Sequence, residues 1–150
     1  MASDTRGYSG DRPPFGRRKK VRLMGDDLLG ISSSVVGQSD CFLQWYEADL
    51  PPEVLQDSLG HFAKISFAAL LVKPDGVMYL YDNSSWPTRS EGVPFFAVGS
   101  GQDFAMGAMA YGAPAIGAIH MAISMDPWSG YPIAGMKHDG TEWLVGASCG

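Results

Sequence analysis

The sequence predicts an α+β fold in which antiparallel sheets are covered by separate pairs of helices. Its strand-like segments occur in pairs joined by short turns, and its helix-like segments also occur in pairs. The two kinds follow one another in blocks, which is typical of α+β folds. Two sheets between two helix layers, an αββα sandwich, are the simplest arrangement of these blocks. The 150 residues suit a single domain spanning 1–150.

The first strands follow an irregular lead-in. Residues 1–16 are rich in Gly, Pro, Ser and Asp and lack periodicity, so we expect an extended, turn-rich segment there. Apolar runs between turn residues predict four strands, at residues 20–24, 28–32, 65–73 and 77–81. Turns at residues 25–27 and 74–76 contain Gly and Asp and join these strands in pairs. The polar segment 82–92 predicts a loop.

Two helices are predicted between the strand pairs. Residues 36–47 carry several large apolar side chains, and Pro51 ends this helix. The serines at residues 32–34 offer N-cap hydroxyl groups just before it. Residues 52–62 predict a shorter helix with Pro52 in its first turn.

The segment from residue 97 to residue 130 organises the chain, and a predicted strand leads into it. In order, we expect a strand, a turn, two helices and a final hairpin, at residues 93–98, 99–101, 102–111, 114–125 and 131–146. The two helices are rich in Ala, Gly and Met, and their small residues would allow close approach to a neighbouring helix or sheet. Residues 147–150 predict a tail.

Composition excludes several classes of function. The net charge of −5 disfavours binding to nucleic acid through phosphate contacts, and the basic run 17–20 with Arg22 is more typical of a solvated junction. Cys41 and Cys149 match no metal spacing, and His120 in an apolar run predicts a satisfied core or rim residue, so we expect no metal and no cofactor. The absence of a signal peptide and of a membrane-length apolar run predicts a cytoplasmic protein without membrane association.

Ser100 and Asp126 are the first candidate site residues. Ser100 lies on a Gly-Ser-Gly turn after a predicted strand, but Val98 and Gln102 stand where a hydrolase nucleophile elbow requires Gly. A helix cap at Ser100 or Asp103 is the alternative. Asp126 ends a predicted helix, where the helix dipole disfavours a negative charge, which indicates a local cation or set of donors. A simple helix stop is the alternative for Asp126.

Asp4 and Lys20 are a second candidate pair. They lie on neighbouring extended segments, where an acid and a base can form an ion pair. A lysine held near carboxylates and hydroxyls can act as a general base, because its pKa moves readily on burial. The sequence shows no Ser-His-Asp or Cys-His set and no phosphate-binding loop.

Four short motifs together resemble the proteasome β-subunit family, in particular the bacterial HslV peptidase and its phage-encoded relatives. The motifs are MASDTR, GRRKKVR, AVGSG and DPWSG, at residues 1–6, 16–22, 97–101 and 126–130. The resemblance implies the N-terminal-nucleophile (Ntn) hydrolase fold. It also implies an N-terminal threonine that attacks the peptide carbonyl and is activated by its own amine.

The resemblance assigns roles to residues of this sequence. Asp4 and Lys20 would prepare the threonine for its attack on the peptide carbonyl. Three polar residues would hydrogen-bond around its free amine, namely Ser100, Asp126 and Ser129. The backbone at Ser32 and Ser33, where small residues or Gly are usual, would supply the oxyanion hole.

The sequence also departs from the family pattern. It begins at the strand that carries Asp4, so we expect the family's first strand and its threonine to be absent, and Thr5 is no substitute because it follows Asp4 directly. One reading is a threonine-type peptidase subunit whose functional form carries extra N-terminal residues. The other is an inactive structural or assembly protein on the same fold, with a phage among its candidate sources. A nucleic-acid-binding module using residues 17–20 is the least favoured reading.

The resemblance further implies partners and location. We expect a homo-oligomeric ring, polypeptide substrates and an ATP-dependent unfoldase as a possible partner, with no nucleic acid, membrane, cofactor or metal involved. The location would be the bacterial cytoplasm, or the host cytoplasm or virion if the protein is phage-encoded.

Overall fold

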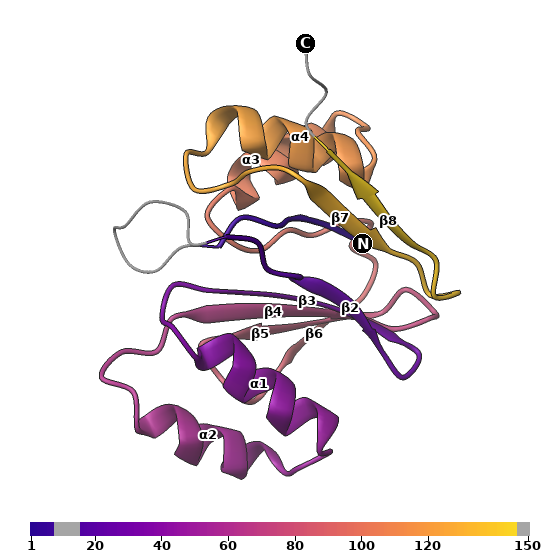
Figure 1. Ribbon diagram of the computed structural model, residues 1–150. Coiled ribbons are helices and arrows are strands. Elements are labelled where there is room, and N and C mark those ends of the chain that lie inside the picture. Colours follow the sequence, from indigo (N-terminus) through magenta and orange to yellow (C-terminus); the bar gives the residue numbers. More distant parts are fainter. Residues whose placement is uncertain (8–15, 147–150) are drawn as a thin grey trace.

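Two antiparallel sheets lie face to face between two pairs of helices in the computed structural model, which describes residues 1–7 and 16–146 (Figure 1). The outer layers are α1 (Gln38–Glu47) with α2 (Pro52–Gly60), and α3 (Gln102–Ala110) with α4 (Ala115–Met125). This arrangement confirms the predicted αββα sandwich. Residues 8–15 of the lead-in, the tail 147–150 and Cys149 lie outside the described residues.

The larger sheet has five strands, in the order β2-β3-β4-β5-β6. Their bounds are Val21–Met24, Asp27–Ser33, Phe67–Val72, Met78–Asp82 and Thr88–Ser90. The β3–β4 register runs from Leu28 opposite Val72 to Ser33 opposite Phe67. The first four strands confirm the predicted hairpins, because apolar runs bounded by Gly- and Asp-containing turns determine such pairing locally. The short strand β6 was not predicted, because its residues are polar and only pairing with β5 orders them.

Helices α1 and α2 cover one face of this sheet and enclose the main core. Phe42 is completely buried, and its ring contacts four other aromatic rings, those of Trp45, Tyr46, Phe67 and Tyr81. Leu55 and Leu59 of α2 are also fully buried in this cluster. The helix predicted at residues 36–47 is therefore confirmed, and its aromatic side chains face the core.

The serines at residues 32–34 do not cap α1, contrary to the prediction. The N-cap is Gly37, which makes no side-chain capping bond. Strand β3 continues through Ser33, and the Ser33 hydroxyl donates to the carbonyl of Val35 and lies 2.8 Å from the Ser39 hydroxyl. Pairing with β4 thus extends the strand past the point where local hydroxyl groups favour a helix start.

The smaller sheet has the order β1-β7-β8, with bounds Ala2–Asp4, Ile133–Met136 and Glu142–Val145. Strand β1 corrects the prediction that residues 1–16 form an irregular lead-in. It pairs antiparallel with β7, with Ala2 opposite Gly135 and Asp4 opposite Ile133. Three residues carry no readable period, so only the long-range pairing makes this segment a strand.

Helices α3 and α4 cover the smaller sheet and pack closely through small side chains. Ala105, Ala118 and Ala122 are buried between them. A Cβ added at Gly101 would lie 2.9 Å from the Cβ of Ala122, so the start of α3 approaches α4 closely. The predicted use of the small residues is confirmed for these alanines, whereas Gly107 has open space where a Cβ would lie. No described helix is long and apolar enough to cross a membrane.

Residues 93–98 form no strand, and this prediction was wrong. Their sequence, VPFFAV, has strong strand character. Strand character is realised only when a neighbouring strand accepts and donates the backbone hydrogen bonds. No described strand pairs with this segment, which instead lines a pocket between the two sheets.

Replacing Gly135 with alanine should lower the free energy of unfolding by about 1–3 kcal/mol, because overpacking displaces a neighbouring side chain. Gly135 lies opposite Trp143 in the β7–β8 pair, and the Trp143 indole occupies the space that a Cβ would need. Urea denaturation measures the change. Gly107→Ala is the matched control, because that helical position has open space and should gain about 0.5–1 kcal/mol. Equal effects of the two substitutions would contradict the packing argument.

Candidate active site

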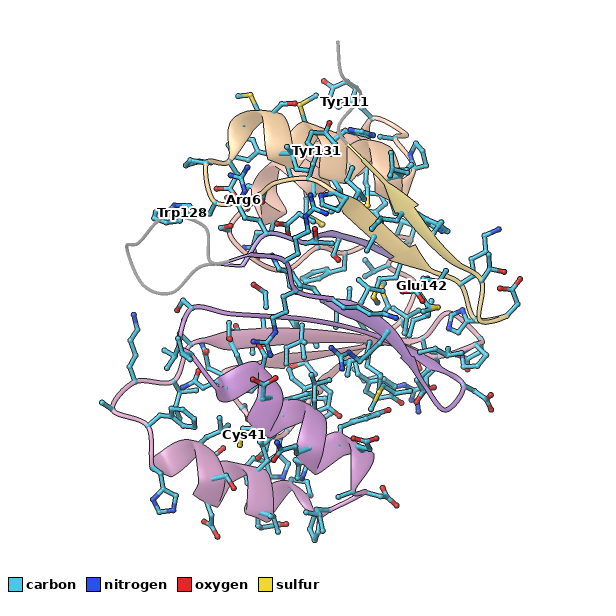
Figure 2. The ribbon with its side chains drawn as sticks, in the orientation of Figure 1. Arg6, Cys41, Tyr111, Trp128, Tyr131 and Glu142 are labelled. Atoms are coloured by element: carbon cyan, nitrogen blue, oxygen red, sulfur yellow. The ribbon has the colours of Figure 1, made fainter. Side chains whose placement is uncertain are left out.

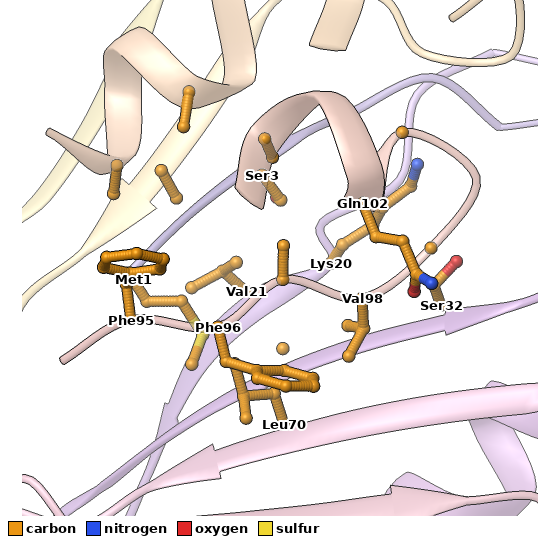
Figure 3. A pocket seen from close by; sticks show the side chains of 18 of the residues that line it. Met1, Ser3, Lys20, Val21, Ser32, Leu70, Phe95, Phe96, Val98 and Gln102 are labelled. Atoms are coloured by element: carbon orange, nitrogen blue, oxygen red, sulfur yellow. The ribbon is translucent and has the colours of Figure 1, made fainter. Parts of the chain in front are cut away.

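A pocket of about 310 Å³ lies between the two sheets. Its walls are β1, residues 94–102, the inner face of the larger sheet and the small residues of α3 and α4. Figure 3 shows Met1, Phe95 and Phe96 at one end, and Lys20, Ser32 and Gln102 at the other. The pocket therefore has an apolar body and a polar end, which is the usual composition of a binding site.

Asp126 receives three hydrogen bonds close to the polar end. The hydroxyl groups of Ser100 and Ser129 each donate to its Oδ2 at 2.6 Å. The backbone N–H of Trp128 donates to its Oδ1 at 3.3 Å. Asp126 follows α4 directly and is only 6% exposed. The sequence predicted local partners for an acid at this helix end, and these three donors are those partners. A cation is not needed to explain its position.

These contacts keep Asp126 ionised. Burial alone would raise the pKa of its carboxyl group. The hydrogen bonds from Ser100 and Ser129 outweigh burial, and the positive charge of Lys20 adds to them, so the pKa lies below its usual value. The site therefore holds an anion that hydroxyl groups orient.

Asp4 and Lys20 form an ion pair beside this cluster. The Nζ of Lys20 lies 2.7 Å from Oδ1 of Asp4, and the side chains are 21% and 13% exposed. The Oδ2 of Asp4 accepts the backbone N–H of Gly130 at 3.2 Å. Because Gly130 follows Ser129, the ion pair and the Asp126 cluster are adjacent. Residues 4, 20, 100, 126 and 129, which are scattered in the sequence, thus meet at one end of the pocket.

Arg6 ties strand β1 to the loop after α4, and sequence reasoning missed it. Its Nη1 donates to the carbonyl of Pro127 at 3.2 Å, and its backbone N–H donates to Asp4. The Arg6 guanidinium occupies the space that a Cβ on Gly130 would need. Figure 2 shows Arg6 and Trp128 on the same side of the molecule. The signal in the sequence was the Asp-x-Arg spacing, because alternate residues of a strand share one face.

Ser32 and Ser33 point in different directions. Ser32 lines the pocket, and its Oγ would lie 3.2 Å from a Cβ built on Gly99. Ser33 faces α1 through its contact with Ser39. The structure therefore brings the segment of Ser32 to the polar end but directs the Ser33 side chain away from it.

Ser100 is not a helix cap, and neither is Asp103. The N-cap of α3 is Gly101, without a side-chain capping bond, and the Ser100 hydroxyl is used by Asp126. The capping interpretation of the Gly-Ser-Gly turn is therefore wrong, and the functional interpretation stays a prediction.

Other candidate groups lie outside the cluster. The Thr5 hydroxyl is buried and donates to the carbonyl of Pro132. His120 shares a hydrogen bond with the Tyr131 hydroxyl, which confirms a satisfied histidine. In the basic run, Arg18 pairs with Asp40 and Lys19 with Glu142. The described residues contain no group of His, Cys, Asp or Glu that could hold a metal ion.

Three solved structures have the same fold as this chain. Thiobacillus denitrificans BPH in complex with epoxomicin matches with a TM-score of 0.66 and 22% identity, over 98% of this chain and 92% of that chain. Eukaryotic HslV from Trypanosoma brucei matches with a TM-score of 0.67 and 15% identity, over 97% and 91%. Anbu, the ancestral beta-subunit from Yersinia bercovieri, matches with a TM-score of 0.70 and 12% identity, over 98% and 82%.

These comparisons show the fold and not the activity. No protein-family profile and no curated protein sequence matches the chain. At identities of 12–22% the likeness shows the Ntn-hydrolase-like architecture shared by HslV-like and Anbu proteins. The phage relation and the absence of a first strand stay predictions.

Proposed function

We propose that this chain is a subunit of a threonine-type peptidase whose nucleophile comes from residues outside the 150 in this sequence. The observation that carries the proposal is the meeting of the Lys20–Asp4 pair with the Ser100–Asp126–Ser129 cluster at the polar end of one pocket. A cluster of titratable groups with charge partners beside a pocket is a candidate for a functional site.

The reaction would be hydrolysis of a peptide bond in two steps. The hydroxyl oxygen of an N-terminal threonine attacks the substrate carbonyl, and its proton passes to the threonine's own amine. The leaving amine of the substrate takes that proton, and an ester between the threonine and the acyl part of the substrate remains. Water then hydrolyses the ester and restores the free hydroxyl group.

The residues of this chain would position and polarise the nucleophile. The Lys20 ammonium group lowers the pKa of a hydroxyl group placed beside it, and Asp4 holds Lys20 in place. Ser100, Asp126 and Ser129 offer hydrogen-bond partners for the amino group of the threonine. Backbone N–H groups near Ser32 would stabilise the oxyanion that forms on the substrate carbonyl.

The proposal extends to assembly and location. We expect a homo-oligomeric ring in the cytoplasm that acts on unfolded polypeptide, with an ATP-driven unfoldase as a possible partner. The resemblance to the HslV peptidase and its phage-encoded relatives supports these expectations.

Replacing Lys20 with methionine should reduce peptide hydrolysis at least about 100-fold, since one positioned electrostatic group contributes that much to a rate. The test uses a fluorogenic peptide and protein that carries the residues, if any, encoded in frame upstream of Met1. Lys19→Met is the matched control, because Lys19 pairs with Glu142 on the surface and should keep its activity.

Covalent labelling by epoxomicin separates this proposal from its alternative. Labelling of the longer protein and not of the 150-residue chain is the expected result. If the upstream sequence encodes no further residues and no labelling occurs, the alternative of an inactive structural or assembly protein on the same fold replaces the proposal.

A further inference from the structure

A row of cations leads into the edge strand of the larger sheet. Arg18, Lys20 and Arg22 are alternate residues of one basic segment, and we call them the cationic row. Strand β2, which begins at Val21, pairs with β3 alone among the described strands, so its other side is an edge of the sheet (Figure 1). The proposed function gives a role to Lys20 but not to the two arginines of the row.

Arg22 and Arg18 lie on the side of the larger sheet that α1 covers. In the β2–β3 register Arg22 is opposite Leu29, and opposed residues of an antiparallel pair project to the same face. Leu29 is fully buried in the core beneath α1. Arg18 forms an ion pair with Asp40 of α1. Both guanidinium groups therefore belong to the face of the sheet edge next to α1.

Lys20 connects the row to the candidate active site. Its carbonyl accepts the backbone N–H of Ile31 at 3.0 Å, so the pairing of β2 with β3 continues to this residue. Ser32 and Ser33, whose backbone is the proposed oxyanion hole, follow Ile31 directly. Two residues of an extended chain span about 7 Å, which is the separation along the chain between Lys20 and Arg22. A side chain next to the cleaved bond of an extended substrate can therefore reach Arg22.

Arg22 lacks an anionic partner among the described residues. Its Nη2 donates to the carbonyl of Lys19 at 2.9 Å, and its Nε is shielded from solvent without any hydrogen-bond partner. By contrast, Arg18, Lys19 and Lys20 each pair with a carboxylate. A half-buried cationic group without an acceptor is costly, and buried polar atoms are nearly always bonded. The surroundings of Arg22 therefore indicate a missing anion.

We propose that Arg22 binds the carboxylate of an acidic side chain in the polypeptide substrate, next to the bond that is cleaved. The preferred substrates are then polypeptides with Glu or Asp beside the cleaved bond. The position relative to the cleaved bond rests on the proposed function, whereas carboxylate binding by Arg22 does not.

The chemistry of the row favours a carboxylate. A guanidinium group presents parallel N–H donors that match the two oxygens of a carboxylate. Arg18 can contribute as well, because its pair with Asp40 is exposed and surface pairs of this kind add little stability. The net charge of −5 disfavours the phosphate backbone of a nucleic acid as the anion.

Hydrolysis of matched peptides tests the preference. The protein carries the residues, if any, encoded in frame upstream of Met1, and two fluorogenic peptides differ only by Glu or Gln on the acyl side of the cleaved bond. We expect kcat/KM to be at least about tenfold higher for the Glu peptide, because hydrogen bonds to a charged group contribute that much.

Variants of the row give the controls for this assay. The ratio of kcat/KM between the Glu and Gln peptides should fall to about one in Arg22→Met. Arg22→Lys keeps the charge but not the planar donor pair, so it should retain only part of the ratio. Arg89→Met is the matched control, because Arg89 pairs with Glu91 on the surface, and it should keep the full ratio.

A measurement that needs no hydrolysis tests the binding itself. The Nε–H signal of Arg22 in an NMR spectrum of the 150-residue chain, assigned by its loss in Arg22→Lys, should shift saturably when acetyl-Leu-Leu-Glu-amide is added. The matched Gln peptide should leave the signal in place. No shift with the Glu peptide at millimolar concentration, an equal shift with the Gln peptide, or tighter binding of inorganic phosphate would overturn the proposal.

The two experiments separate carboxylate binding from peptidase activity. Equal hydrolysis of the Glu and Gln peptides would overturn the preference and leave the peptidase standing. A selective shift of the Arg22 signal without hydrolysis of either peptide would support carboxylate binding by Arg22 and count against the proposed function.

Discussion

Replacing Phe42 with alanine should lower the free energy of unfolding by about 3–5 kcal/mol, the usual cost of deleting a fully buried phenyl ring. Phe42 has no exposed surface and contacts the rings of Trp45, Tyr46, Phe67 and Tyr81. The deletion leaves a cavity between α1 and the larger sheet that these rings cannot fill without leaving their rotamers. Chemical denaturation followed by circular dichroism measures the loss.

A matched phenylalanine gives the control for this prediction. Phe104 on α3 is 38% exposed, so Phe104→Ala should cost much less. Phe42→Leu should fall between the two, because it keeps part of the buried volume. A loss below about 1 kcal/mol for Phe42→Ala would mean that α1 is not anchored by this side chain.

Replacing Asp126 with alanine should cost about 2–4 kcal/mol at neutral pH, because two hydrogen bonds to a charged group are lost and their donors are left behind. Those donors are the hydroxyl groups of Ser100 and Ser129. The substitution should also release the loop after α4 from the start of α3. Asp103→Ala, at an exposed position in the first turn of α3, is the control and should change stability by less than about 1 kcal/mol.

The pH dependence of the Asp126 variant has a definite sign. The pKa of Asp126 is lowered in the folded protein, so the group contributes stability above the pKa of about 3.9 that it has in the unfolded chain. That contribution is lost as the pH falls through the folded-state pKa. The stability difference between the wild type and Asp126→Asn should therefore be constant from pH 7 to 5 and shrink below about pH 4. A difference that grows at low pH would contradict the assignment.

Local sequence predicted most elements of the fold because their signals are local. Strands β2 to β5 of the larger sheet are apolar runs that end at Gly- and Asp-containing turns, and Pro51 and Pro52 mark the boundary between α1 and α2. Such signals depend on about ten neighbouring residues, so they can be recognised without knowing which distant segments pack together. Strand β6 was missed because it has three residues and owes its conformation to its pairing with β5. Local pattern missed β1 for the same reason, and only the family resemblance placed a strand at Asp4.

The contacts among the candidate site residues were predicted only in part. The ion pair of Asp4 and Lys20 was predicted and is present in the structure. Ser100 and Asp126 are 26 residues apart and were singled out separately, one as a turn and one as a helix end. Their 2.6 Å hydrogen bond depends on how closely α3 and α4 pack, which no local pattern reports. The same holds for Gly130, whose lack of a side chain admits the Arg6 guanidinium.

The sequence by itself determined the fold class, because the periods and turns that specify its paired strands and helices are short-range properties of the chain. Tertiary structure alone decided that residues 93–98 form no strand, that β6 is a strand, and that Ser100 and Ser129 both donate to Asp126. The physical reason is that backbone hydrogen bonds and carboxylate contacts across the two sheets join residues more than 100 positions apart, such as Asp4 and Gly130. These hydrogen bonds and contacts contribute to stability only after the layers have packed together.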